Sequence, residues 1–134
     1  MFVDASAMVA ILTAEPEAAA LSDTLEKARS PITSPIAIFE AIQGIRRIRH
    51  SSVAEAQADV TEFLTIAGMQ TVSITQREIE AALDAMSRYG VGTTHPAQLN
   101  LSDCFAYAVA KNYCAPLLSS ADRFALTDIK TATN

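Results

Sequence analysis

MFVDASAMVAIL, residues 1–12, contains the transition around which the rest of the fold is predicted to form. The apolar run 1–3 ends abruptly at Asp4, and the eight residues that follow are apolar except for Ser6. This pattern predicts a buried strand and then a buried helix over 5–12, with Ser6 placed to cap the helix. A carboxylate between two buried elements is costly unless its charge is compensated. Asp4 is therefore either a helix cap or part of a functional site.

Helical and extended patterns alternate along the remaining chain. Further strands are predicted at 30–33, 69–74 and 115–119, with a short one at 127–130, and helices at 16–29, 35–49, 52–67, 75–90 and 101–112. Such alternation predicts an α/β fold in three layers, α/β/α, with a central, mostly parallel sheet of about four to five strands. Parallel sheets of this kind bind ligands at the carboxyl ends of their strands.

The helix predicted at 35–49 separates an apolar from a polar face. Glu40 shares its face with Ile36, Gln43 and Arg47, so it points either to solvent or into a cleft. The apolar stripe consists of Ile38, Phe39, Ile42, Ile45 and Ile48.

Length and composition indicate one globular domain over residues 1–134. The chain is 50% apolar and 19% charged, which excludes a disordered protein, and 134 residues suffice for one hydrophobic core but not two. No apolar run approaches the roughly 20 residues that span a bilayer, and no basic leader precedes the first strand. We therefore expect a cytoplasmic protein without membrane association.

Cys104 and Cys114 fall at opposite ends of one predicted helix, too far apart for a disulfide, and are expected to be buried thiols.

The net charge of −5 argues at first against a nucleic-acid partner. A cation site built from four acids would, however, account for most of this excess. The basic residues Arg46, Arg47, Arg49 and His50 are clustered at a predicted helix end. That cluster either complements the helix dipole or contacts phosphates, and the residues alone do not decide between the two.

Four acids map to the predicted carboxyl edge of the sheet. Asp4 ends the first strand, Glu40 follows the second, Asp122 follows the strand at 115–119, and Asp103 begins the preceding helix. Converging carboxylates repel one another unless a cation lies among them, and oxygen ligands suit Mg²⁺ or Mn²⁺. Such an ion can promote hydrolysis of a phosphodiester without a catalytic His or Ser. The sequence has no glycine-rich phosphate loop, Cys/His metal spacing or nucleophile elbow.

Four segments together resemble a known family: MFVDASAMVAIL, SPIAIFEAIQGI, HPAQLNLSDCFAYAVAK and APLLSSADRFALTDI. They are similar to the PIN-domain ribonucleases, most closely to VapC-like toxins of bacterial VapBC toxin–antitoxin pairs. The resemblance implies that Asp4, Glu40, Asp103 and Asp122 are the acidic site residues. Asp4 and Asp103 would bind the metal directly, and the other two through water. Ser6 and Ser120 would be hydrogen-bond donors beside the site.

The resemblance also implies a function and partners. The expected activity is endoribonucleolytic cleavage of structured RNA, often transfer RNA, dependent on Mg²⁺ or Mn²⁺ and silenced by a VapB-like antitoxin. A homodimer is expected too. The alanine-rich helices at 16–29 and 52–67 could provide the dimer or antitoxin contact, or simply pack on the sheet. Tyr89 and His95 belong to the matching segments and are interpreted as residues that order a loop.

Two alternatives come from other classes of protein. The first is a catalytically inactive PIN-like module that binds RNA or a partner, against which the presence of all four acids argues. The second is a phosphoacceptor receiver domain, which requires adjacent acids after the first strand, an acceptor Asp after the third and a late Lys. Here Asp4 stands alone, the third predicted strand is followed by Thr75, and Lys111 lies within a helix.

Overall fold

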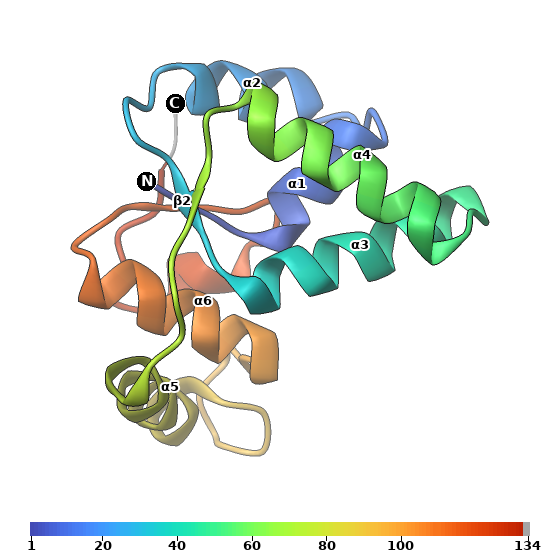
Figure 1. Cartoon of the computed structure of the whole chain (residues 1–134). Coiled ribbons are helices and arrows are strands. Elements are labelled where there is room, and N and C mark those ends of the chain that lie inside the picture. The colour runs from blue at the N-terminus through green and yellow to red at the C-terminus, as the bar shows by residue number, and fades with distance from the viewer. Residues whose placement is uncertain (133–134) are drawn as a thin grey trace.

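The structure is a computed structural model that describes residues 1–132. Strands and helices alternate along the chain as the sequence predicts (Figure 1). The elements are β1 (Phe2–Val3), α1 (Ala5–Leu12), α2 (Ala18–Glu26), β2 (Ile32–Thr33), α3 (Pro35–Arg49), α4 (Val53–Ile66), β3 (Gln70–Thr71), α5 (Gln76–Tyr89), α6 (Leu101–Asn112), β4 (Leu117–Leu118) and a 3₁₀ helix (Arg123–Leu126).

The four strands form one parallel sheet in the order β3-β2-β1-β4. β1 is central, because Phe2 pairs with Ile32 on one side and Leu117 on the other. The ladder extends past β1, where the Asp4 amide donates to the carbonyl of Leu118 at 2.9 Å. The carboxyl ends of all four strands therefore meet at one edge, and Asp4 lies there.

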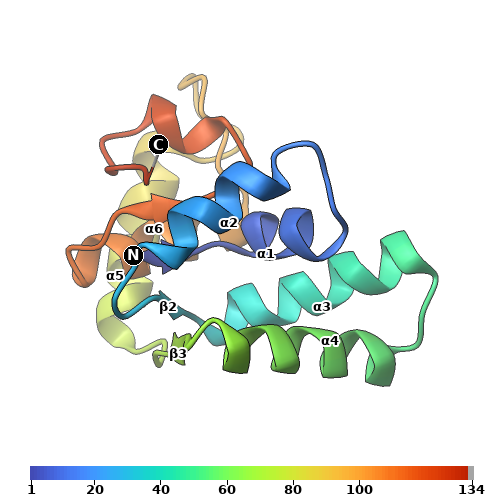
Figure 2. The ribbon, with the colours of Figure 1, turned by 90° about the horizontal axis from the view of Figure 1, so that it is seen from above.

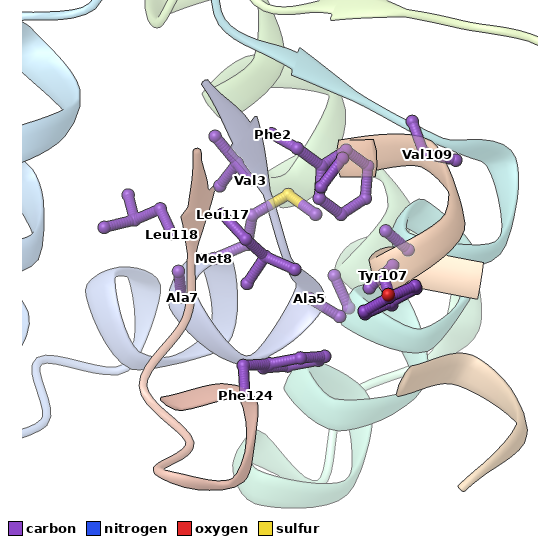
Figure 3. Packing of buried hydrophobic residues seen from close by; sticks show 14 of the residues in the cluster. Phe2, Val3, Ala5, Ala7, Met8, Tyr107, Val109, Leu117, Leu118 and Phe124 are labelled. Carbon is purple, nitrogen blue, oxygen red and sulfur yellow. The ribbon is translucent and has the colours of Figure 1, made fainter. Parts of the chain in front are cut away.

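Helices cover both faces of the sheet. In Figure 1, α5 and α6 lie below the strands, α2 lies above them, and α1 and α4 lie to their right. Figure 2 shows α3 and α4 side by side, extending away from the sheet. The core lies between α1, α6 and the sheet, and Figure 3 shows Phe2, Met8, Tyr107, Leu117 and Phe124 converging there. This three-layer arrangement confirms the predicted fold class.

Helix caps explain why the longer helices begin where the sequence predicts. Ser34 accepts a hydrogen bond from the amide of Ala37, with Pro35 in the first turn of α3. Reciprocal capping boxes start α4, α5 and α6. For α1 the assignment of the cap to Ser6 is wrong, because Asp4 is the N-cap and Ser6 donates to it.

Three further predictions need correction. Phe39 and Ile48 are 73% and 49% exposed, because α3 packs through its small residues and Ile45. Residues 127–130 form no strand; a single bridge joins Leu117 to Thr131. Cys114 is exposed, since the chain turns there with φ of +50°, whereas Cys104 is buried as predicted. Within residues 1–132, every helix is too short or too polar to cross a bilayer.

Candidate active site

A cavity of about 470 Å³ opens at the carboxyl edge of the sheet. Asp4 and Glu40 lie in its wall, together with Gln43 and Arg47 from the polar face of α3. The sequence left open whether Glu40 points to solvent or into a cleft, and the structure places it in the wall of the cleft. Asp103 is 2% exposed and lies behind the cavity wall. Its carboxylate accepts a hydrogen bond from Arg123, which itself lines the cavity.

Asp4 is a buried carboxylate with its two oxygens in different environments. Its Oδ2 accepts hydrogen bonds from the amide and hydroxyl of Ser6, at 3.2 and 2.6 Å. Its Oδ1 has no hydrogen-bond partner among residues 1–132. Burial raises the pKa of Asp4 to about 6, opposed by the Ser6 hydrogen bonds and reinforced by the charges of Glu40 and Asp103. Asp4 is therefore both the cap that the sequence allowed and a strained carboxylate at a cavity.

Asp103 and Glu40 are each held by one oxygen in the same way. Asp103 Oδ2 accepts from the amide of Asn100 at 3.0 Å and from Arg123 Nε at 2.6 Å. Glu40 Oε2 accepts from the hydroxyl of Ser102, which ties α3 to the first turn of α6. The second oxygen of each carboxylate has no partner within the described chain.

Ser6 connects the site to the last strand of the sheet. Its hydroxyl proton goes to Asp4, so the Ser119 hydroxyl, 2.9 Å away, must act as donor to Ser6 Oγ. The amide of Ser120 donates to the same oxygen at 3.1 Å. Ser6 thus lies beside the acids as a donor. Ser120 contacts Ser6 and not a carboxylate, because its hydroxyl donates to the carbonyl of Ser6 at 3.3 Å.

Asp122 differs from the other three acids in its surroundings. Its side chain is exposed and does not line the cavity, and its carbonyl accepts from Ala125 at the start of the 3₁₀ helix. The structure accordingly brings together Asp4, Glu40 and Asp103. Within residues 1–132 no three acidic, His or Cys side chains are grouped closely enough for all to be direct ligands of one metal ion.

The donor set nevertheless fits a hard divalent cation. The three neighbouring carboxylates offer only oxygens, one free oxygen on each. Among residues 1–132, no His or Cys side chain lines the cavity. Mg²⁺ usually takes one or two carboxylates directly and fills its remaining positions with water and substrate oxygens. Two direct ligands and one water-bridged acid satisfy that preference.

The basic cluster at the end of α3 divides into different roles. Arg47 lines the cavity. Arg49 instead forms an ion pair with Asp59 at 2.7 Å and donates to the carbonyl of Leu12, so it fastens α3 to α4 and α1. His50 ends α3 in the left-handed conformation.

Tyr89 and His95 order the loop between α5 and α6. Their rings meet edge to face at 4.7 Å between centroids, and His95 Nδ1 accepts from the amide of Ala97 at 3.0 Å. Neither residue lines the cavity that contains Asp4 and Glu40, called the acid cavity below. Their interpretation as loop-ordering residues agrees with these contacts.

Sequence reasoning missed Ser102, Ser119 and Arg123. Each acts on a residue far along the chain: Ser102 on Glu40, Ser119 on Ser6, and Arg123 on Asp103. The only signal in the sequence was that Ser102 and Arg123 are next to predicted site acids.

Comparison with known proteins places this geometry in context. The profile of the PIN domain family matches residues 1–130. A VapC ribonuclease of Rhizobium meliloti is 37% identical, with the alignment covering 96% of this chain and 98% of that protein. Ribonuclease VapC42 of Mycobacterium tuberculosis is 33% identical, with 98% of each chain covered.

Solved structures agree in fold. The crystal structure of Mycobacterium tuberculosis VapC20, described as a toxin that cleaves the sarcin-ricin loop, superposes with a TM-score of 0.79 at 14% identity over 99% of this chain and 98% of that one. A chain from a toxin–antitoxin complex of Klebsiella pneumoniae gives a TM-score of 0.65 at 17% identity, over 92% and 89%.

Proposed function

The chain belongs to the PIN domain family, among the VapC ribonucleases, and from this premise we propose that the Asp4, Glu40 and Asp103 cleft is the centre that cleaves RNA. The protein is an endoribonuclease toxin of a toxin–antitoxin pair, as its relatives over nearly the full length are VapC ribonucleases. The observation that carries the assignment of the site is the buried Asp4. Its free oxygen and the charges of two neighbouring acids meet at the carboxyl edge of the sheet.

The proposed cofactor is Mg²⁺, with Mn²⁺ as a substitute. Asp4 and Asp103 would bind it directly through their free Oδ1 atoms, and Glu40 through water. When bound, such an ion lowers the pKa of a water ligand and neutralises charge on a phosphodiester. Asp122 remains a proposed water-mediated participant, supported by its sequence position and by its exposed side chain, which is free to turn.

The protein's own side chains would orient the reaction. Ser6 and Ser102 fix Asp4 and Glu40, so that each keeps one oxygen toward the cavity. The free Oε1 of Glu40 would accept a proton from the attacking water and align it with the phosphorus. Arg47, in the same wall, would bind a flanking phosphate of a structured RNA such as transfer RNA.

The partner surfaces are proposed from exposed apolar side chains. A groove of about 350 Å³ between α2 and α4 is lined by Leu25, Phe63 and the 78%-exposed Ile66, and would receive an apolar segment of the antitoxin.

A second apolar face, formed by α5, α6 and the loop between them, would join two copies of the chain. That face consists of Ile79, Leu83, Met86, Val91 and Leu101. It carries no charge, so it can meet itself across a twofold axis without repulsion.

Cleavage assays with charge-removing variants test the assignment. In Mg²⁺, Asp4→Asn and Asp103→Asn should each reduce cleavage of total bacterial RNA by more than about 100-fold, because even groups that only orient metal ligands cost 10- to 100-fold. Glu17→Gln is the matched control, since Glu17 lines the same cavity without belonging to the acid cluster, which consists of Asp4, Glu40 and Asp103. Sequencing of the new RNA 5′ ends would identify the substrate.

Two results would contradict this function. An Asp4→Asn protein that cuts RNA in Mg²⁺ at the wild-type rate would place the catalytic centre elsewhere. A folded wild-type protein that binds RNA but leaves it intact in Mg²⁺ and in Mn²⁺ would favour the inactive PIN-like module, the alternative that the acid cluster disfavours.

A further inference from the structure

Arg123 is the one cation in direct contact with the acid cluster among residues 1–132. Its Nε donates to Asp103 Oδ2 at 2.6 Å, while its side chain, 40% exposed, lies along the cavity wall beside Asp4. This hydrogen bond and the charges of Asp103, Asp4 and Glu40 all raise the pKa of the guanidinium. Arg123 thus carries a permanent positive charge that faces all three acids.

Charge counting sets how many further cations the cluster can accept. Three carboxylates with one guanidinium leave two negative charges uncompensated, which a single divalent ion neutralises. Two divalent ions would leave a positive excess in a site where Asp4 and Asp103 are almost fully buried.

The pattern of hydrogen bonds leads to the same number. Paired metal ions in phosphodiester-cleaving sites lie about 3.5–4 Å apart, a spacing that a carboxylate spans with one oxygen on each ion. Here Asp4 and Asp103 have each committed Oδ2 to two protein donors, so neither can bridge a pair of ions by placing one oxygen on each ion.

Accepting the proposed function as its basis, we infer that Arg123 takes the place of a second metal ion, so that this centre binds one divalent cation. In two-ion sites the second ion stabilises the leaving oxygen. Arg123 can supply that charge from the protein, because its Nη groups have no acceptor within the described residues and its side chain borders the cavity. It would donate them to the phosphate as charge develops on it.

The stoichiometry of Mn²⁺ binding tests this inference. Metal-stripped full-length protein is titrated with MnCl₂, and free Mn²⁺ is counted by electron paramagnetic resonance. We expect one bound ion for the wild type and for Arg123→Lys, which keeps the charge, and two for Arg123→Gln, which releases Asp103 Oδ2 and removes the charge. Arg47→Gln is the matched control, as it deletes a charge from the same cavity wall at a residue with no ion pair to the three acids, and it should bind one ion.

The outcomes separate this inference from the proposed function. Two ions in the wild type, or the same stoichiometry in wild type and Arg123→Gln with folding verified by thermal melting, would overturn it. RNA cleavage by wild type and its loss in Asp4→Asn would in that case still support the nuclease. If the wild type binds no Mn²⁺ and cuts no RNA, the proposed function itself fails.

Discussion

Asp4 serves two purposes with one side chain. One oxygen caps α1 through Ser6, and the other is kept free at the cavity. A cap alone would be satisfied by an exposed Asp, Ser or Asn, so the burial of this charge beside Glu40 and Asp103 is what supports the proposed role of Asp4 in the site. From the sequence, the cap and the site were two competing explanations. The structure shows the cap, and the second carboxylate oxygen remains available for the proposed site.

The metal-free protein should become less stable as the pH rises from about 4 to about 6. The pKa of Asp4 is raised from 3.8 to about 6 in the folded state, so in this window the folded protein retains a proton that the unfolded chain has released. Asp4→Asn should remove this pH dependence and raise the free energy of unfolding at pH 7.5 by on the order of 2 kcal/mol. Urea unfolding in EDTA at pH 4.5, 6 and 7.5 measures both effects.

Asp23→Asn is the control for that experiment, because Asp23 is an exposed acid on α2. Its stability profile should follow the wild type. If the free energy of unfolding of Asp4→Asn changes with pH in the same way as that of the wild type, burial does not raise the pKa of Asp4 as proposed.

Among the elements, α1 and α3 determine how closely Asp4 and Glu40 approach. Gly44 allows this approach: a Cβ built at this position would lie 2.9 Å from Cγ2 of Val9 on α1. Val9 and Gly44 both line the acid cavity. The sequence predicted α3 to the residue, because Ser34 and Pro35 give a strong start signal. Its apolar stripe was right for Ile38, Ile42 and Ile45 and wrong for Phe39 and Ile48, because small residues such as Gly44 also set the packing.

Gly44→Ala should destabilise the protein by about 1 kcal/mol, although alanine favours the helix, since the added methyl overpacks against a stiff β-branched side chain. In a Val9→Ala background the same substitution should stabilise by up to about 1 kcal/mol, because the clash is gone and the propensity gain remains. Thermal and urea unfolding of the four proteins in this double-mutant cycle measures the coupling. Equal effects in the two backgrounds would contradict the proposed contact.

At the scale of the whole molecule, the sequence predicted the layers and the meeting of Asp4, Glu40 and Asp103, since parallel strands bring their carboxyl ends to one edge. It did not predict Ser102 on Glu40 or Arg123 on Asp103. These contacts join residues 62 and 20 positions apart, and tertiary packing alone decides them. The orientation of Asp122 depends on the 3₁₀ turn that follows it, which short-range patterns do not signal.

The uncharged face of α5 and α6 predicts assembly into dimers of the 14.3 kDa chain. Met86→Glu should convert the dimer to a monomer, because it places two charges in an apolar contact across the twofold axis. Val53→Glu, at a 57%-exposed apolar residue of α4, introduces the same charge elsewhere and should leave the dimer intact. Light scattering coupled to gel filtration gives the masses. A monomeric wild type at micromolar concentration would refute this assembly.

The hydrogen bonds that join Ser6 to Ser119 and Ser120 have a consequence for timing. The proposed site is completed by segments from the two ends of the chain, with β4 beside β1 in the sheet and Arg123 hydrogen-bonded to Asp103. A nascent chain still held in the ribosome has made Asp4 and Glu40 but cannot yet unite them with their later partners. The proposed site is therefore incomplete until synthesis is nearly finished, and a cognate inhibitor has that interval in which to be present.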